Sequence, residues 1–172
     1  LVGRQYSGSI TGSYGGGNVT GTYRTGGLIG SFSGNTITNC YATGNVTGGQ
    51  ATGGLIGDSW QGTVTNCYST GNATGSTYVG GFLGYLAGGS FVNCFWDVEA
   101  SGNSVGGGSY SPTGLTSKTT AQMQTQATFT SASWDFTTIW KMDSRSNSGY
   151  PYLQWQTFVQ KPIVLVKSAK NI

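Results

Sequence analysis

Charged residues are scarce in this sequence of 172 residues, and histidine is missing altogether. Asp, Glu, Lys and Arg make up 8% of the chain, against about a quarter of an average soluble domain. Without histidine, the chain lacks the most common general base and metal ligand. The few basic residues form no patch that would indicate nucleic-acid binding. No apolar run approaches the length of about 18 residues that a membrane-spanning helix needs.

Glycine and aromatic residues are abundant instead. The chain has 31 glycines, and aromatic side chains make up 13% of it. Low charge combined with much glycine is typical of disordered segments. The aromatic content argues against disorder here, because it provides apolar surface that a fold can bury.

A short glycine-rich pattern recurs at a constant step along the chain. It is present as Gly26-Gly27-Leu28-Ile29-Gly30, as Gly53-Gly54-Leu55-Ile56-Gly57 and as Gly80-Gly81-Phe82-Leu83-Gly84. The same step relates Asn39-Cys40-Tyr41 to the corresponding residues in the next two units. A fixed period of this length predicts a solenoid or a similar array. We assign the repeats to 1–105, divided into units 1–24, 25–51, 52–78 and 79–105.

The repeats favour β-structure over helices. Glycine in a helix costs about 1 kcal/mol at each position, and these units are rich in glycine, Thr, Val, Ile and Tyr. We therefore expect an all-β fold, a right-handed parallel β-solenoid (β-helix) of about four coils. Each coil should contain three short strands and three corners, giving a rod about 19 Å long.

Equivalent residues of successive coils should stack into columns. We expect three inward-facing columns: Ile10, Ile37, Val64 and Phe91; Cys40, Cys67 and Cys94; and Val19, Val46 and Ala73. The cysteines are expected to be buried thiols, with a disulfide between coils or a metal site as alternatives. Asn39, Asn66 and Asn93 should form a ladder of side-chain amides at a corner.

These repeats resemble the GLUG-repeat family, which is named for a Gly-Leu-apolar-Gly signature. The signature is present as Gly27-Leu28-Ile29-Gly30 and Gly54-Leu55-Ile56-Gly57, and the third copy carries Phe82 in place of Leu. The resemblance implies a large microbial cell-surface or secreted protein, a class that includes adhesins. It supplies no catalytic residues. It also extends to Trp134-Asp135-Phe136 and Tyr150-Pro151-Tyr152-Leu153 beyond the repeats.

The period ends after residue 105, and we expect residues 106–156 to form a C-terminal cap over the open end of the solenoid. Thr119 or Thr120 is the expected N-cap of a short helix, and Trp96 indicates that the last coil is altered where the cap meets it. The clustered aromatic residues should pack within the cap, and a sugar-stacking platform is the alternative. These residues are Trp134, Phe136, Trp140, Tyr150, Tyr152 and Trp155. Residues 157–172 are expected to be a linker or a strand-donating tail.

Chemistry-bearing residues are few. Asp97 and Glu99 are the only close acidic pair, and we expect a solvated surface pair, with a calcium site or a paired-carboxylate hydrolase as alternatives. No catalytic, cofactor-binding or metal-binding residue is assigned. The sequence therefore predicts that the chain is not an enzyme and needs no cofactor.

Three surfaces are candidates for binding or modification. Tyr14, Tyr41 and Tyr68 form an outward aromatic column that either stacks on itself or contacts glycans. Paired threonines could form a face like that of ice-binding solenoids, or could be ordinary β-favouring residues; these are Thr36, Thr38, Thr63 and Thr65. Asn18, Asn45 and Asn72 lie in N-x-T patterns and are candidate glycosylation sites.

We expect a non-catalytic structural or adhesive module at the cell surface or outside the cell, with a glycan- or ice-binding solenoid as the alternative. Its partners should be copies of itself or further coils of a longer chain, and surface glycans are further candidates. Neither nucleic acid nor membrane insertion is expected. The candidate assembly residues lie near the two ends of the sequence and are Leu1, Val2, Ile163, Val164, Leu165 and Val166. End-to-end assembly into a filament and continuation of the solenoid upstream are both open.

Overall fold

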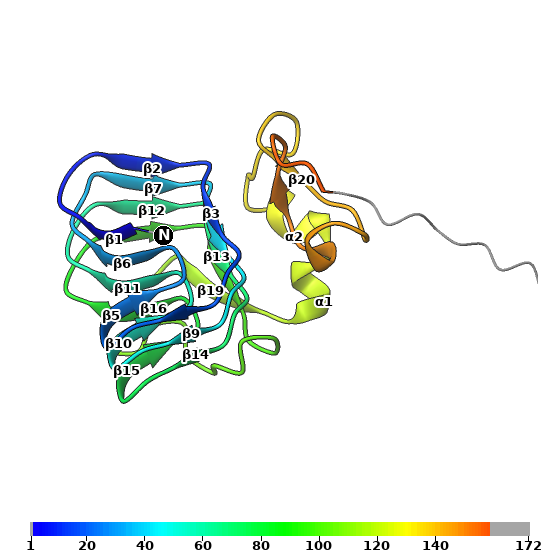
Figure 1. The fold of residues 1–172 in the computed structure, drawn as a ribbon. Helices are drawn as coiled ribbons and strands as arrows, with labels where there is room; N and C mark the ends of the chain where they lie inside the picture. The colour runs from blue at the N-terminus through cyan, green and yellow to red at the C-terminus, as the bar shows by residue number, and fades with distance from the viewer. Residues whose placement is uncertain (1, 159–172) are drawn as a thin grey trace, which may run out of the picture.

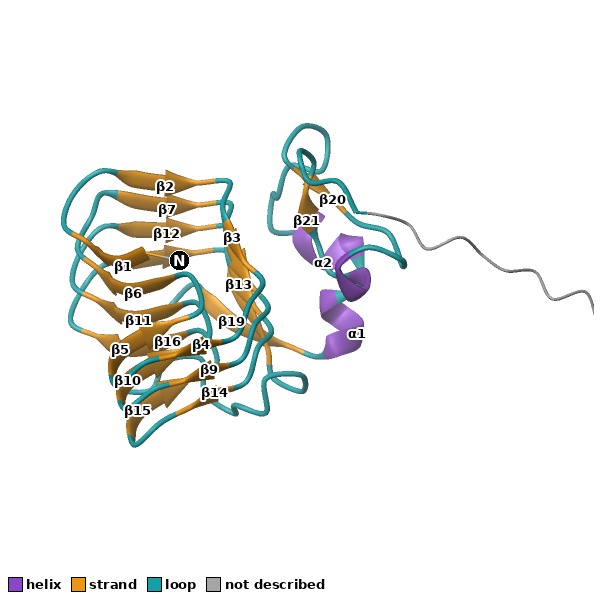
Figure 2. Ribbon diagram, in the orientation of Figure 1, coloured by secondary structure: helices purple, strands orange, loops and turns teal. Residues whose placement is uncertain are grey.

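The structure is a computed structural model that describes residues 2–158. Most of it is a stack of coils, in which each strand pairs in parallel with the equivalent strand of the next coil (Figure 1). Equivalent residues, such as Asn18 and Asn45, are separated by 27 residues along the chain. The two short α-helices lie in a separate C-terminal part (Figure 2). The prediction of an all-β solenoid of about four coils is therefore confirmed. Among the described residues, no helix has the length and apolar character to cross a membrane.

Five parallel sheets run along the stack. The first contains β1 (Val2–Gln5), β6 (Ile29–Phe32), β11 (Ile56–Ser59) and β16 (Leu83–Leu86). The second contains β2 (Ser9–Thr11), β7 (Thr36–Thr38), β12 (Thr63–Thr65) and β17 (Ser90–Val92). The third contains β3 (Tyr14–Gly15), β8 (Tyr41–Ala42), β13 (Tyr68–Ser69), β18 (Cys94–Asp97) and β19 (Leu115–Lys118). The fourth contains β4 (Val19–Thr20), β9 (Val46–Thr47) and β14 (Ala73–Thr74). The fifth contains β5 (Tyr23–Gly26), β10 (Gln50–Gly53) and β15 (Thr77–Gly80).

A complete coil has five short strands, so the expectation of three strands and three corners is wrong. The cause is local. The segment Thr43-Gly44-Asn45 separates β8 from β9, and Gly54-Leu55 separates β10 from β11. Glycine and asparagine tolerate the backbone conformations of turns, so they divide two of the three expected strands in two.

The expected inward columns form the core. In the second and third coils Ile37, Val64, Cys40 and Cys67 have no exposed surface, and Cys94 continues the cysteine column in the fourth. All three cysteines are buried and free, as predicted. Val46 and Ala73 are also buried. Equivalent residues stack because a shift of one full period returns every side chain to the same place in the coil.

The asparagine ladder lies elsewhere than expected. Asn39, Asn66 and Asn93 have positive φ angles of 55°, 52° and 52°, so they serve as corner residues in the left-handed conformation that asparagine tolerates. The ladder instead involves the candidate glycosylation sites. The Oδ1 of Asn18 accepts a hydrogen bond from the backbone N–H of Asn45 at 2.9 Å, and Asn45 accepts one from the N–H of Asn72 at 3.0 Å.

The stack does not stop at residue 105. Strand β19 pairs in parallel with β18, and Gly107 bridges to Leu83, so residues 106–118 add part of a fifth coil. Trp96 stands where earlier coils have Ala42 and Ser69, and its side chain is buried in the solenoid core. Its indole N–H donates to the carbonyl of Asn103 at 3.1 Å. The last coil is thus altered, and the indole closes its interior together with Leu115.

The C-terminal part packs against the side of the solenoid, and the expectation that it covers an open end is wrong. It contains α1 (Thr120–Met123), α2 (Gln126–Thr130), the 3₁₀ helix η1 (Asn147–Gly149) and the antiparallel pair β20 (Trp140–Lys141) and β21 (Tyr152–Leu153). In Figure 1 it stands beside the third sheet. Thr119 is the N-cap of α1, in a capping box with Gln122. The physical reason for the lateral position is the aromatic column described next, which gives this unit an apolar surface to cover.

Candidate functional site

The tyrosine column forms as a stack and is then covered. The rings of Tyr14 and Tyr41 lie 5.3 Å apart, and those of Tyr41 and Tyr68 lie 4.9 Å apart and parallel within 1°. Tyr41 and Tyr68 are 1% and 0% exposed, because the C-terminal aromatic residues pack on them. These two tyrosines therefore cannot belong to a surface ligand face. Tyr14, at 44% exposed, is the one member of this column that reaches the surface.

Hydrogen bonds fix the phenol groups of the covered tyrosines. The hydroxyl of Tyr41 donates to Gln156 at 2.9 Å, and that of Tyr68 donates to the carbonyl of Pro151. Burial raises the pKa of Tyr41 to about 12 and that of Tyr68 well above its usual range. Trp134 and Trp140 are buried in the same cluster, which leaves them unable to act as a sugar platform. The column is thus a structural interface.

The prediction of a solvated surface pair is wrong for Asp97, whereas the Glu99 side chain is exposed. Asp97 has no exposed surface, and it accepts hydrogen bonds from the hydroxyls of Tyr150 at 2.8 Å and Thr120 at 3.0 Å. Two backbone N–H groups also donate to its Oδ1, and Glu99 accepts from the backbone N–H of Thr120 at 2.9 Å. Burial, followed by the hydrogen bond to Asp97, raises the pKa of Tyr150. The pair fastens the C-terminal part to the solenoid.

The other candidate residues have mixed positions. The threonines Thr36, Thr38, Thr63 and Thr65 stack in register but are half-buried. Asn18, Asn45 and Asn72 are exposed, so their glycosylation stays a prediction. Val2 lies in β1, where it pairs with Ile29. The remaining candidate assembly residues lie outside the described residues, namely Leu1, Ile163, Val164, Leu165 and Val166.

The three thiols of the cysteine column are buried, and the hydrogen bond with Cys67 lowers the pKa of Cys40. The Sγ of Cys67 lies 3.4 Å from the backbone N of Cys40, which donates to it, and 3.2 Å from the carbonyl of Thr65. Burial raises the pKa of the Cys67 thiol well above its usual range. A protonated thiol without access to solvent is a poor nucleophile.

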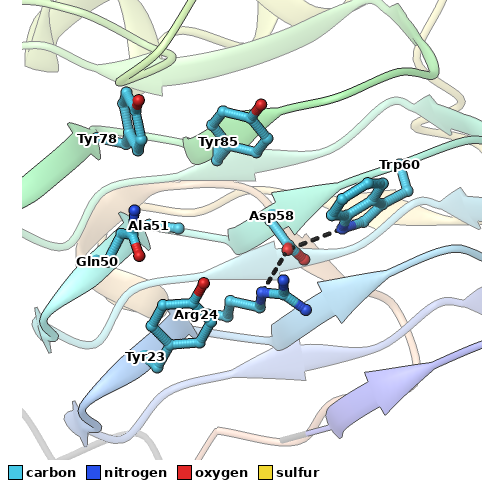
Figure 3. Close-up of a pocket in the computed structure, with 8 residues that line it drawn as sticks. All are labelled: Tyr23, Arg24, Gln50, Ala51, Asp58, Trp60, Tyr78 and Tyr85. Carbon is cyan, nitrogen blue, oxygen red and sulfur yellow. Dashed lines mark hydrogen bonds and ion pairs between the residues drawn. The ribbon is translucent and has the colours of Figure 1, made fainter.

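A pocket that the sequence did not reveal lies on the flank formed by the first and fifth sheets (Figure 3). Its volume is about 270 Å³, and four of its eight lining residues are aromatic. The side chains that line it come from all four repeat units and are Tyr23, Arg24, Gln50, Ala51, Asp58, Trp60, Tyr78 and Tyr85. Tyr23, Trp60 and Tyr78 are 56%, 46% and 39% exposed. This is an open surface site with large aromatic faces.

A buried carboxylate lies at the centre of this pocket. Asp58 is 1% exposed, and its Oδ2 lies 2.9 Å from the Nε of Arg24 and 2.8 Å from the indole Nε1 of Trp60, which donates to it (Figure 3). Its other oxygen, Oδ1, is buried and has no hydrogen-bond partner among the described residues. A buried carboxylate oxygen without a donor is costly, and Oδ1 has almost no exposed surface through which a ligand could reach it.

The guanidinium of Arg24 holds the aromatic wall in place. Its Cζ lies 5.0 Å from the ring centre of Tyr23 and 5.7 Å from that of Trp60, within the range of cation–π contacts. On the far side, the rings of Tyr78 and Tyr85 lie 5.1 Å apart. Arg24, Ala51 and Tyr78 are equivalent residues of successive coils, and all three have positive φ angles, between 48° and 59°.

Comparison with known proteins identifies the repeats. The family model described as "the GLUG motif" matches residues 21–47 and 48–74. The chain carries GLUG repeats. No curated protein matches the sequence at a significant level.

One solved structure with the same fold is named a "putative immunoglobulin A1 protease" from Bacteroides ovatus. It is 21% identical, with a TM-score of 0.63 over 87% of this chain. This chain spans 58% of the length of that protein. At this level of identity the similarity establishes the β-solenoid fold alone, because one fold supports many functions.

The GLUG repeats explain why sequence analysis missed the pocket. The last glycine of each motif is followed by Ser31, Asp58 and Tyr85 in successive coils, and two residues later by Ser33, Trp60 and Ala87. The constant step indicates only the residues that are the same in successive repeats. The pocket is built where the GLUG repeats differ from one another, so comparing the units for departures at equivalent positions would have indicated it.

Proposed function

We propose that this chain is a non-catalytic structural and adhesive module of an extracellular microbial surface protein. The observation that carries the proposal is the stack of GLUG coils to which a second unit is fastened laterally. Buried columns within the stack and the covered tyrosines beside it support a rigid element. The GLUG repeats support the extracellular location through the resemblance described above.

The carboxylates support a non-catalytic role, because each of the five has structural partners. Asp58 pairs with Arg24, and Asp97 and Glu99 bind the segment around Thr120. Asp135 accepts hydrogen bonds from the backbone of Thr137 and Thr138, and Asp143 accepts one from Tyr152 at 2.6 Å. The bond from Tyr152 lowers the pKa of Asp143 to about 2. A general acid needs the opposite shift, towards the operating pH.

The test is an assay of the purified chain for hydrolysis. Intact human immunoglobulin A1 and a set of common polysaccharides are incubated with the chain, and products are followed by mass spectrometry and by reducing-end release. We expect no product above the level of a heat-denatured sample. Cleavage that depends on the folded chain would contradict the non-catalytic part of the proposal, and loss of that activity in Asp97→Asn or Asp58→Asn would locate the site.

We further propose that the coils associate with other coils, of neighbouring copies or of a longer chain. Every coil joins the next through a parallel ladder, and such an edge is a template for another strand. Sizing by light scattering and negative-stain electron microscopy of the chain at high concentration test self-association. Filaments or larger particles are expected, whereas a uniform monomer contradicts self-assembly and leaves only association within a longer chain.

A further inference from the structure

We propose that the pocket around Asp58 binds a neutral saccharide, one sugar residue deep, and gives this module its adhesive specificity. This inference deepens the adhesive role proposed above and rests on it. The pocket is distinct from the tyrosine column, which the C-terminal part covers. Four features support a saccharide ligand: the shape of the site, its polar atoms, its charge and the coil that forms its floor.

The shape of the pocket fits a single sugar ring with neighbouring residues left in solvent. A volume of about 270 Å³ lies just below the usual range for small-molecule sites. The exposed rings of Tyr23, Trp60 and Tyr78 stand around it. Aromatic faces offer flat apolar surfaces with polar tips, which suit the apolar C–H face and the polar rim of a pyranose.

The pocket contains polar groups of both kinds, hydrogen-bond donors and acceptors, that lack a partner. The Oδ1 of Asp58 lacks a donor among the described residues. The ion pair uses the Nε of Arg24, which leaves the terminal amino groups of this guanidinium without a partner in the same part of the chain. The amide of Gln50 also lines the pocket. The Oδ1 of Asp58 is too deeply buried to be reached by a ligand, so the groups that a ligand can bind are the guanidinium of Arg24 and the amide of Gln50. A ligand must accept from Arg24 and can both donate to and accept from Gln50, and adjacent hydroxyl groups on one ring do both.

Charge selects against ionic ligands. Asp58 and Arg24 form a neutral pair at 2.9 Å, so the site offers no net attraction to an anion or a cation. A quaternary ammonium is disfavoured because it would meet the positive charge of the Arg24 guanidinium beside Tyr23 and Trp60. A phosphate or carboxylate would lie against the Asp58 carboxylate and be repelled. A neutral polyol remains the class that suits the uncharged site and the polar groups of Arg24 and Gln50 that line it.

Ala51 creates the space. Its equivalents in the adjacent coils are Arg24 and Tyr78, and all three share the left-handed backbone conformation. The small side chain in the middle coil leaves a gap that its larger neighbours border. A tyrosine at this position would adopt the backbone conformation that Tyr78 already has, and its ring would fill the pocket without removing any polar group.

The experiment measures binding of defined saccharides to the whole chain. Maltotriose, cellotriose, mannotriose, chitotriose and galactobiose are titrated to about 10 mM, which nearly fills a site with a Kd of about 1 mM. Saturation-transfer NMR and tryptophan fluorescence report binding. Sialyllactose, choline and inorganic phosphate are the charged probes. We expect saturable binding of at least one neutral saccharide and none of choline or phosphate.

Three variants locate the site. Ala51→Tyr should abolish binding, and Trp60→Ala should weaken it about tenfold or more. Trp155→Ala, which removes an exposed indole outside the pocket, should leave binding unchanged. Thermal unfolding confirms that each variant is folded. If Ala51→Tyr does not fold, the site is located by comparing saccharide binding of Trp60→Ala with that of Trp155→Ala.

Two outcomes overturn the inference. One is the absence of binding by every neutral saccharide, or binding of a charged probe alone. The other is neutral-saccharide binding that survives both Ala51→Tyr and Trp60→Ala, which would place the ligand elsewhere. Neither outcome affects the non-catalytic structural role, because that role is tested separately by the hydrolysis assay. A chain that binds no sugar and cleaves nothing would keep the structural proposal and lose this one.

Discussion

Single glycines decide how closely the coils can pack. The last glycine of the second GLUG motif, Gly57, lies where the first and fifth sheets meet backbone to backbone. A Cβ at this position would lie 2.5 Å from the backbone carbon of Arg24 and 2.7 Å from the backbone nitrogen of Thr25. Those atoms belong to a paired strand and cannot move aside. The motif thus ends in glycine because a side chain has no space.

Replacing this glycine tests the close approach. Gly57→Ala should lower the free energy of unfolding by about 3 kcal/mol or more, because overpacking against backbone atoms costs at least the upper end of the usual range. Gly17→Ala is the matched control, since its added Cβ would meet nothing within 4 Å. Urea unfolding followed by circular dichroism measures both. Equal stability of the two variants would show that the sheets are less tightly packed than described.

At the residue scale, repetition makes the core predictable, but it gives no information on buried polar residues that occur in one coil only. The inward positions of Ile37, Val64 and Cys67 follow from the period alone, because equivalent residues must share one environment. The prediction fails for Asp97 because a carboxylate two residues from another looks solvated in sequence. Its burial depends on Tyr150 and Thr120, 53 and 23 residues further along the chain. No local pattern contains that information.

At the scale of elements, the principal contact is between the tyrosine column and the C-terminal part. The column stacks as predicted, but its cover lies on the flank of the rod and not at its end. An aromatic-rich segment can close an end or lie on a flank, and composition does not distinguish the two. The position is decided by the outward-facing aromatic column of the third sheet, which needs a cover, and by Trp96, which closes the last coil from within. Thr119 is predictable as a helix N-cap because its capping box is local.

Alkaline titration tests whether this contact exists in solution. Burial raises the pKa of Tyr41 to about 12, and it also raises the pKa values of Tyr68 and Tyr150 well above the value of about 10 that tyrosines have when unfolded. The folded state therefore holds these protons more tightly. Its stability is complete below about pH 10 and is lost as the pH rises towards 12, by about 1.4 kcal/mol per pH unit for a fully buried tyrosine such as Tyr68.

The measurement is the ultraviolet absorbance of tyrosinate, compared between folded and urea-unfolded protein. Of the ten tyrosines, those named above should ionise late in the folded chain, while all ten should ionise together near pH 10 when it is unfolded. Tyr68→Phe should remove one late-ionising group. Identical titration curves for the folded and unfolded chains would mean that the C-terminal part does not cover the column.

At the scale of the whole molecule, the fold depends on the constant period of the repeats. Val2 pairs with Ile29, Ile29 with Ile56 and Ile56 with Leu83, so the contact between one coil and the next is equivalent along this sheet. Stability in such arrays is approximately the sum of terms for the coils and for the contacts between neighbours. The first coil should therefore be able to pack on the third coil as well as on the second.

Deleting one coil tests this equivalence. Removal of residues 25–51 joins Arg24 to Thr52, which is the residue equivalent to Thr25, so Val2 should pair with Ile56 and Tyr14 should stack on Tyr68. We expect a folded chain that is shorter by about 4.8 Å. It should unfold at a lower urea concentration, because one contact between coils is lost.

Removal of residues 25–50 is the control. That deletion shifts the first coil by one residue and turns its apolar side chains outward. Amide hydrogen exchange should show protection of residues 9–20 after the first deletion and its loss after the second. Equal protection in both variants would show that the first coil does not depend on the register of the repeats.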